Sequence, residues 1–266
     1  MSLLKHARVP LALTAILTAL QAPHAWAQDH GDADRDAGGP GGSTWGLGVG
    51  ASIARSRYKG IGNDNVFFPL VTYESRVVKL FGNVLDIRLP SEGPLDFALR
   101  AKVGLGEGYR ASRSPYLSGM KSRSDSIYLG AVTTWHAGFA DLSVDYLKDV
   151  SGNSKGSRLQ FGIDRAFIFD DRYLVTPHAS VTRLDAKYVD YYDGVEASEA
   201  TATRPAYLGK SATETELGVR FGWLVTRNQR LLLDVSDTHW GSGISSSPIV
   251  DRKSTPGLKI GYLHGF

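Results

Sequence analysis

The sequence contains no cysteine. Its absence excludes a disulfide framework, a lipid-modified N-terminal cysteine and thiolate catalysis. Long apolar runs are missing as well. The most apolar stretch, residues 9–20, is shorter than the roughly 20 residues that a helix needs to cross the hydrocarbon core of a bilayer. The sequence therefore does not predict an α-helical membrane protein.

The first 27 residues have the order of a secretory signal peptide. Lys5 and Arg8 come first, the apolar stretch follows, and a polar segment then ends in Ala25-Trp26-Ala27. A basic start, an apolar centre and a small-residue cleavage site characterise such peptides. We predict cleavage after Ala27 and export of the remaining chain.

The mature chain has almost no net charge. Removal of Lys5 and Arg8 leaves 28 of the 30 basic residues against 27 acidic ones, although the isoelectric point of the full sequence is about 9.0. Nucleic-acid binding requires a basic stripe or patch. We therefore expect no nucleic-acid partner.

Residues 28–44 are rich in Gly and Asp and have almost nothing to bury. Such a composition predicts a flexible periplasmic tail. Five of its side chains could be considered a metal cluster, but a solvated linker is the preferred interpretation: Asp29, His30, Asp32, Asp34 and Asp36. The domain that follows is expected over residues 45–266.

From residue 45 onward the sequence alternates with a period of two. In residues 95–106, Phe97, Leu99 and Val103 share one phase, while Arg100 and Lys102 share the other. A strand has alternating faces, and a helix does not explain this pattern. Eleven segments are predicted as strands: residues 45–54, 65–74, 77–89, 95–106, 126–135, 139–147, 157–169, 172–184, 214–226, 230–238 and 258–266.

Three features favour a transmembrane barrel over a soluble sandwich. The strands reach the roughly 9–11 residues that a tilted strand needs to span a bilayer. The last strand alternates up to a terminal Phe266, as in outer-membrane barrels, with His264 as a departure. Aromatic side chains flank the apolar faces as interfacial girdles do: Tyr128, Trp135, Tyr146, Phe167, Phe169 and Trp223. We predict an antiparallel up-and-down β-barrel in the outer membrane.

Bacterial single-chain barrels have even strand numbers. Eleven segments therefore require one more strand, which is predicted within residues 107–125 and gives twelve; ten remain possible if two early segments merge. With the last strand running toward the periplasm, the connections after Leu147, Leu184 and Thr238 are predicted outside, as is the turn at residues 91–94. The links at 170–171 and 226–229 are predicted as periplasmic turns.

Several short segments occur in a specific order along the mature chain. They are Tyr58 with 65–73, Tyr109-Arg110 with 114–120 and Arg123, 149–156, Thr176-Pro177, 191–195, Glu199-Ala200, 204–207 and 246–251. Together they resemble the MltA-interacting protein / OmpV family of outer-membrane proteins. Physically these are turn segments, in which Gly152, Gly156 and Gly194 permit backbone conformations closed to other residues. We expect them to shape loops rather than to contact a ligand.

Charged side chains on the polar phase should point into the lumen. Since an unpaired buried charge is unfavourable, a structural network of ion pairs is preferred over a polar conduit. The set is Arg100, Lys102, Asp141, Asp145, Arg158, Asp164, Glu216, Arg220 and Asp234.

An enzyme is the less favoured alternative. His178 and Ser180 share one inward face and Glu214 and Glu216 another, so a Ser-His-Glu arrangement is conceivable, but no nucleophile motif accompanies it. His136, His239 and His264 lack metal-ligand spacing. We assign no catalytic, cofactor-binding or metal-binding residue.

The family resemblance implies a noncatalytic scaffold that brings a lytic transglycosylase and a peptidoglycan synthase together at the outer membrane, with membrane lipid as its other partner. The alternative is a small-solute channel or a surface receptor or adhesin that acts through the outer loops. The loop at residues 185–213 contains the tyrosines that would serve recognition: Tyr188, Tyr191, Tyr192 and Tyr207. Oligomeric state is left open.

Overall fold

The computed structural model describes residues 43–266. The predicted signal peptide and nearly all of the predicted tail lie outside these residues. Strands dominate the described chain: β1 Thr44–Arg55, β2 Asn63–Glu74, β3 Val78–Phe81, β4 Val84–Leu89, β5 Leu95–Val103, β6 Ile127–His136, β7 Asp141–Asp149, β8 Ser157–Asp164, β9 Phe167–Phe169, β10 Tyr173–Leu184, β11 Ala212–Thr226, β12 Gln229–Trp240 and β13 Ser254–Gly265.

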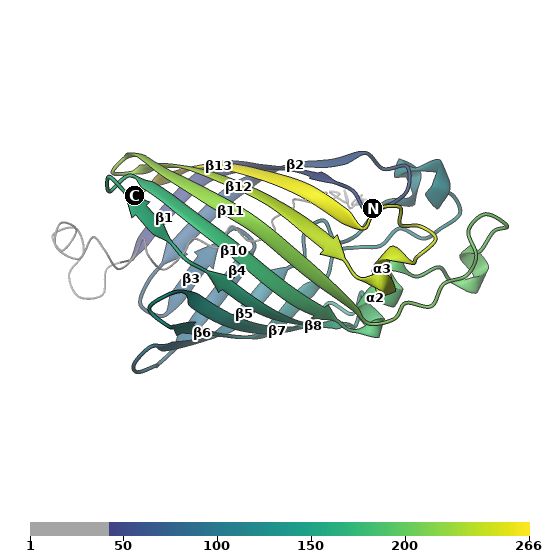
Figure 1. The fold of residues 1–266 in the computed structure, drawn as a ribbon, viewed down its shortest axis with the longest axis horizontal. Coiled ribbons are helices and arrows are strands. Elements are labelled where there is room, and N and C mark those ends of the chain that lie inside the picture. The colour runs from purple at the N-terminus through teal and green to yellow at the C-terminus, as the bar shows by residue number, and fades with distance from the viewer. Residues whose placement is uncertain (1–42) are drawn as a thin grey trace, which may run out of the picture.

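The strands form one closed antiparallel barrel (Figure 1). Consecutive strands pair with one another except β8 and β9, and β13 pairs with β1 to complete the ring. β8 and β9 both pair with β10 in a single register, so they are two parts of one strand. The break lies opposite Pro177, which has no N–H to donate to the ladder. The barrel therefore has twelve strands, as predicted.

The twelfth strand lies elsewhere than predicted. Residues 77–89 are not one strand but a hairpin, β3 and β4, which turns at Gly82-Asn83. Gly82 has a φ of 57°, a left-handed conformation that glycine adopts without strain. Residues 107–125 form a loop instead, with one isolated bridge between Tyr109 and Arg123 and the short 3-10 helices η1 (Ala111–Arg113) and η2 (Pro115–Leu117).

The extra hairpin also reverses one predicted connection. The turn at residues 91–94 lies at the same end of the barrel as the turns at 170–171 and 226–229, and not at the end with the long loops. The reason is that β3 and β4 run in opposite directions and return the chain to this end, whereas a single strand would have carried it to the other end. We call this end, which also holds Thr44 and Phe266, the turn end. The opposite end, the loop end, carries the connections after β7, β10 and β12 as predicted.

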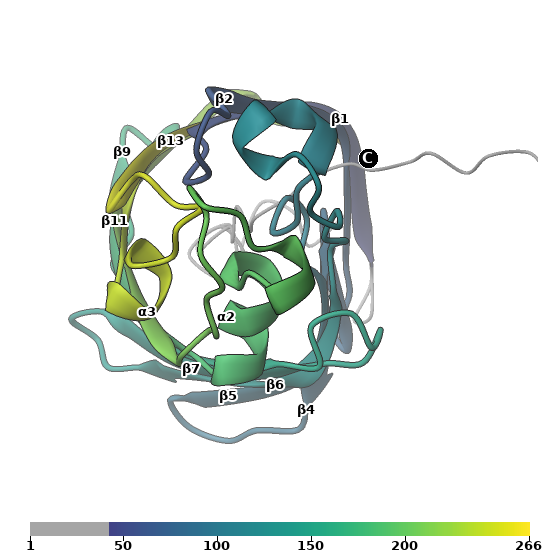
Figure 2. The same cartoon turned by 90° about the vertical axis from the view of Figure 1, so that its right-hand side faces the viewer.

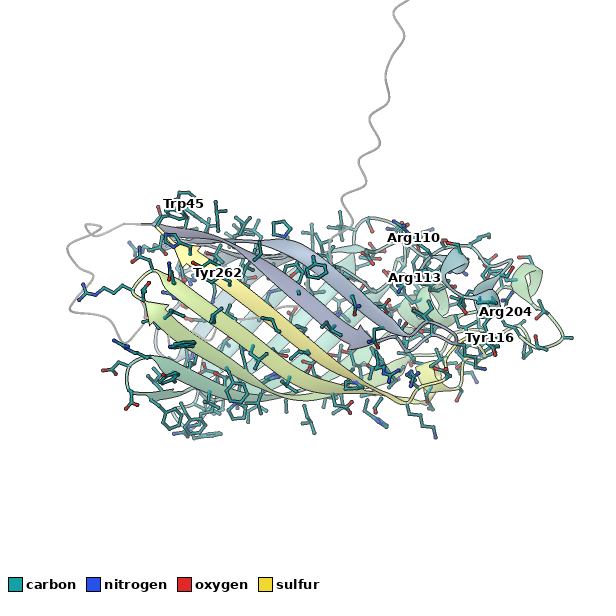
Figure 3. All side chains as sticks on the ribbon, turned by 90° about the horizontal axis from the view of Figure 1, so that it is seen from above. Trp45, Arg110, Arg113, Tyr116, Arg204 and Tyr262 are labelled. Carbon is teal, nitrogen blue, oxygen red and sulfur yellow. The ribbon has the colours of Figure 1, made fainter. Side chains whose placement is uncertain are left out.

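The outer wall of the barrel is apolar. Outward side chains include Val49, Phe97, Phe161 and Leu217, all exposed. Trp45 and Tyr262 lie near the turn end (Figure 3), where the ring of Trp45 stacks on that of Phe266 at 4.3 Å between centroids. This wall matches a lipid-facing surface with aromatic side chains at its edge.

Of the predicted girdle residues, all but one are exposed: Trp135, Tyr146, Phe167, Phe169 and Trp223. Tyr128 is the exception, because it lies on the inward phase of β6 and is fully buried. Within residues 43–266, no helix combines the length and the apolar character needed to cross a bilayer.

Candidate functional site: a charged lumen beneath a plugged mouth

The loops at the loop end fold inward and fill the mouth of the barrel. Figure 2 shows helix α2 (Ala186–Asp193) and helix α3 (Ser242–Ser245) inside the ring of strands. Their apolar side chains form one buried cluster with other loops, which we call the plug: Tyr58, Ile61, Tyr109, Leu117, Met120, Tyr128, Leu147, Leu184, Tyr188, Val189, Tyr192, Val195, Ala212, Ile244, Ile249 and Val250.

Helix α2 is the centre of the plug. It begins where Asp185 accepts a hydrogen bond from the backbone N–H of Tyr188 at 2.8 Å, and it ends before Gly194. The Asp185 side chain thereby satisfies a donor that the first turn leaves free. The face formed by Tyr188, Val189 and Tyr192 is buried against the other loops.

Two different physical reasons explain the glycines of these loops: a positive φ and close approach of another residue. Gly152 has a φ of 81°, as expected for a turn glycine. Gly156 and Gly194 do not have positive φ, contrary to the prediction. They provide room instead: a Cβ at Gly156 would lie 2.6 Å from the Tyr188 nitrogen, and one at Gly194 would lie 2.1 Å from the Asp190 oxygen.

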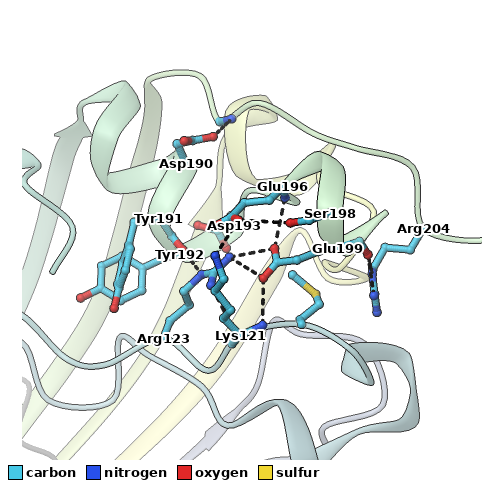
Figure 4. A network of polar contacts seen from close by, with 12 residues as sticks. Lys121, Arg123, Asp190, Tyr191, Tyr192, Asp193, Glu196, Ser198, Glu199 and Arg204 are labelled. Carbon is cyan, nitrogen blue, oxygen red and sulfur yellow. Dashed lines mark hydrogen bonds and ion pairs between the residues drawn. The ribbon is translucent and has the colours of Figure 1, made fainter. Parts of the chain in front are cut away.

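Two buried ion pairs hold the plug together. The guanidinium of Arg57 donates from Nε to Asp193 at 2.8 Å, and its central carbon lies 4.7 Å from the ring centroid of Trp240. Arg123 pairs with Glu199 at 2.9 Å (Figure 4). Each pair joins loops that are distant in the sequence, so it fixes one arrangement of the mouth.

A further arginine binds backbone carbonyls. The buried Arg204 donates to the carbonyl oxygens of Glu199 and Ser118, at 2.7 Å and 3.0 Å, and also to that of Tyr116. It thereby ties the 3-10 helix η3 (Ala197–Glu199) to the loop that holds η2. The guanidinium is satisfied by the protein itself rather than offered to a ligand.

The tyrosines expected to serve recognition are mostly internal. Tyr188 and Tyr192 are buried, and Tyr191 and Tyr207 are half-buried, because all four pack into or against the plug. Burial raises the pKa of Tyr188 well above its ordinary value and raises the pKa of Tyr109 to about 12. The prediction of a tyrosine-rich outer surface on this loop is thus wrong.

The lumen is charged, as the alternation predicted. A cavity of about 180 Å³ is lined by all but one of the predicted inward charges, together with Lys79, Asp86, Glu214 and Lys259. The exception, Asp234, is also buried and contacts Arg220 and His178. Alternation along each strand was sufficient to identify this wall.

Most of the deeply buried lumen charges are paired. Arg100 bonds Asp86 at 2.8 Å and Asp145 at 2.5 Å. Arg158 bonds Glu107 at 2.9 Å, where burial raises the pKa of the Glu107 carboxyl above its ordinary range. The Arg100 bonds connect β5 with β4 and β7 along the inner wall, and the Arg158 bond joins β8 to the loop after β5. The contacts fit the predicted structural network of ion pairs.

The conceivable Ser-His-Glu arrangement is not assembled. His178 Nε2 lies 3.1 Å from Asp234, and Nδ1 lies 3.9 Å from Glu216. Ser180 lines the same cavity, but among residues 43–266 it makes no hydrogen bond to His178. A nucleophile activated by a neighbouring base requires that bond. His178 is instead within hydrogen-bond distance of Asp234, which the sequence did not single out as its partner.

The chain matches the family model for the MltA-interacting protein MipA over residues 47–266. Among curated proteins it is 28% identical to the outer membrane protein OmpV of Vibrio cholerae and 27% identical to the outer membrane protein Omp26La of Vibrio anguillarum. Each match covers 56% of this chain and only 58% of the relative. The putative outer membrane protein YiaT of Escherichia coli O157:H7 is 22% identical over 79% of this chain and 85% of its own length.

Solved structures align with the chain at low TM-scores. The KdgM porin aligns with a TM-score of 0.40 and 8% identity, over 85% of this chain and 99% of its own. OprB of Pseudomonas putida aligns with a TM-score of 0.43 and 9% identity, over 85% and 94%. Similarity at this level has no bearing on function. The family match, the outer-membrane relatives and the closed apolar-walled barrel agree, and the chain is an outer-membrane β-barrel protein of the MltA-interacting protein MipA family.

Proposed function

We propose that this protein is a noncatalytic scaffold that holds a murein-degrading lytic transglycosylase, and with it a peptidoglycan synthase, at the inner face of the outer membrane. The observation that carries the proposal is the plugged mouth. Loops packed around buried ion pairs occupy the entrance that an open pore needs, which favours the barrel as an anchor. The family description names a transglycosylase-binding protein and supports the partner.

The turn end is the surface proposed for the enzymes. It consists of short connections, and its most charged one is Asp170-Asp171-Arg172. Asp170 and Asp171 are both exposed and have φ of 48° and 51°, so their carboxylates stand on a tight turn. An interface of this kind is polar at its rim and gains specificity from such charges.

Co-purification from detergent-solubilised outer membranes tests the scaffold. The native chain is expected to retain the transglycosylase and the synthase. A double variant, Asp170→Asn with Asp171→Gly, keeps the left-handed turn but removes both charges, and should release them at lower salt. The control is Glu196→Gln at the loop end, which should retain both enzymes. Recovery of neither enzyme with the native chain would rule the scaffold out.

A small-solute channel is the second candidate, and the charged cavity is the observation that favours it. Within the described chain, Lys102 and Glu214 line this cavity without an ion pair, so they are available to a polar solute. Planar-bilayer recordings distinguish the two functions. A channel predicts discrete conductance from the native protein, whereas a plugged scaffold predicts none.

A surface receptor would instead use exposed loop side chains such as Tyr116 and Leu208.

A further inference from the structure

Part of strand β2 has no neighbouring strand on one of its two sides. Strand β2 has twelve residues and pairs with β1 along all of them. On its other side, β3 has only four residues and pairs with Thr72, Tyr73 and Glu74 alone. In Figure 1, β2 continues toward the loop end. The short β3–β4 hairpin therefore leaves the upper part of one edge of β2 without a strand.

The backbone groups on that edge can be identified. In an antiparallel sheet the N–H and C=O of successive residues point to alternate sides. The Val71 carbonyl accepts from Gly82 N at 2.9 Å, so odd-numbered residues of β2 face β3. Asn65, Phe67 and Pro69 must then face the open edge. At its top, the Asn63 carbonyl accepts from Arg113 Nη2 at 3.3 Å, which bounds the open stretch.

Within residues 43–266, no contact satisfies these edge groups. The Asn65 and Phe67 N–H groups and the carbonyls of Asn65, Phe67 and Pro69 have no bond on this side. The Phe67 side chain is 82% exposed, and the outward neighbours Val49 and Ile53 on β1 are apolar and exposed too. The edge therefore borders the lipid-facing wall, where no water is present to satisfy backbone groups and leaving them unpaired is strongly unfavourable.

We propose that this edge binds the same edge of a second copy of the chain, so that two barrels pair through antiparallel β2 strands related by a two-fold axis at Phe67. The sequence of the edge is self-complementary about that residue. Phe67 would pair with Phe67, and Asn65 would face Pro69 of the other copy, whose carbonyl accepts the Asn65 N–H. The Asn65 and Phe67 N–H groups of each copy thus gain an acceptor, and Pro69 has no N–H that would need one.

The two Phe67 side chains would lie on the same outer face of the joined sheets. Residues that exchange both hydrogen bonds in an antiparallel pair have Cα atoms about 5.5 Å apart. At that spacing aromatic side chains contact one another across the strands. The most exposed large apolar side chain of the described barrel would then be covered by its own copy.

Cysteine cross-linking in native membranes tests this pairing. Because the chain has no cysteine, any disulfide must come from the introduced residue. A Cα separation of about 5.5 Å permits a disulfide. Phe67→Cys is expected to give a covalent dimer under mild oxidation. An equimolar mixture of Asn65→Cys and Pro69→Cys chains should cross-link more than either chain alone, since only the mixture places cysteines opposite one another.

The matched control is Leu217→Cys, an exposed outward residue on β11. It should form no more dimer than random collision produces. The proposal is overturned if Phe67→Cys cross-links no better than Leu217→Cys, or if it joins a protein of another mass. Sedimentation of the native protein in detergent provides an independent measurement: a dimer mass supports the pairing, and a monomer mass in mild detergent and in lipid nanodiscs alike contradicts it.

Discussion

Arg57 and Asp193 are both buried in the plug, and their contact joins the loop after β1 to the end of α2. Removing one member of such a pair leaves an uncompensated charge in the interior, whereas an exposed pair contributes little because water screens it. Both kinds of pair occur at the loop end, since Lys121 and Glu196 form an exposed one. Single residues therefore differ widely in how strongly they keep the mouth closed.

Replacement of Asp193 by Asn should loosen the plug. We expect a loss of about 3–5 kcal/mol in the free energy of opening the plug, because Arg57 then stays buried without a counter-charge. Amide hydrogen exchange across residues 186–199 measures this opening. The control Glu196→Gln removes a charge from the exposed pair and should change the exchange little. Equal exchange in both variants would contradict the role of Arg57.

At the scale of elements, the plug is a packed core made of loops. Its members come from the connections after β1, β5, β10 and β12 and from neighbouring strand ends, and tyrosines supply much of the buried volume. Tyr58 and Tyr188 have their pKa raised by burial, which disfavours the charged phenolate. The folded form therefore holds these protons more tightly than the unfolded form does. The contribution of these tyrosines to stability is therefore constant below the ordinary tyrosine pKa of about 10 and falls as the pH rises above it.

Alkaline titration followed by tyrosinate absorbance should reveal these buried rings. The folded protein is expected to ionise fewer tyrosines than the denatured chain at about one pH unit above the ordinary pKa of about 10. Tyr109→Phe should remove a group whose pKa is about 12. Identical folded and denatured curves would show that the mouth is open to water.

At the scale of the whole molecule, the plug separates the lumen from the loop end. The cavity beneath it has charged walls, but α2 and its neighbours fill the mouth above (Figure 2). Conductance should therefore depend on the loop after β10 more than on the wall itself. A pore that is closed by packed side chains needs those side chains removed before it conducts.

Replacement of residues 186–210 by a short Gly-Ser linker should open the barrel. We expect conductance in planar bilayers that the native protein lacks, because the linker removes the centre of the plug while β10 and β11 remain paired. In the control, only the exposed residues 201–203 are changed to Gly and Ser, and the mouth should stay closed. If the deletion variant inserts correctly into the bilayer but shows no conductance, another barrier closes the lumen.

Much of the barrel could be predicted from alternation alone. The inward position of Arg100, Asp145 and Arg158, the outward aromatic positions at Trp135 and Trp223, and the closing strand to Phe266 all follow from a period of two. The strand boundaries did not, because Gly82-Asn83 lies inside residues 77–89, which are rich in strand-forming apolar residues on both sides of it and were predicted as one strand. Tyr128 was wrongly predicted to face outward, because the aromatic character of a residue does not show whether it lies on the inward or the outward phase of its strand.

The outer-membrane barrel, its family and the charged lumen could be inferred from the sequence alone, because each depends on local order or on a repeating phase; cleavage after Ala27 stays a prediction. The plug, the partners of His178 and the open edge of β2 became known only from the folded chain. These features depend on contacts between segments far apart in the chain, such as Arg57 with Asp193 and Arg123 with Glu199, and local alternation contains no information about which loops meet.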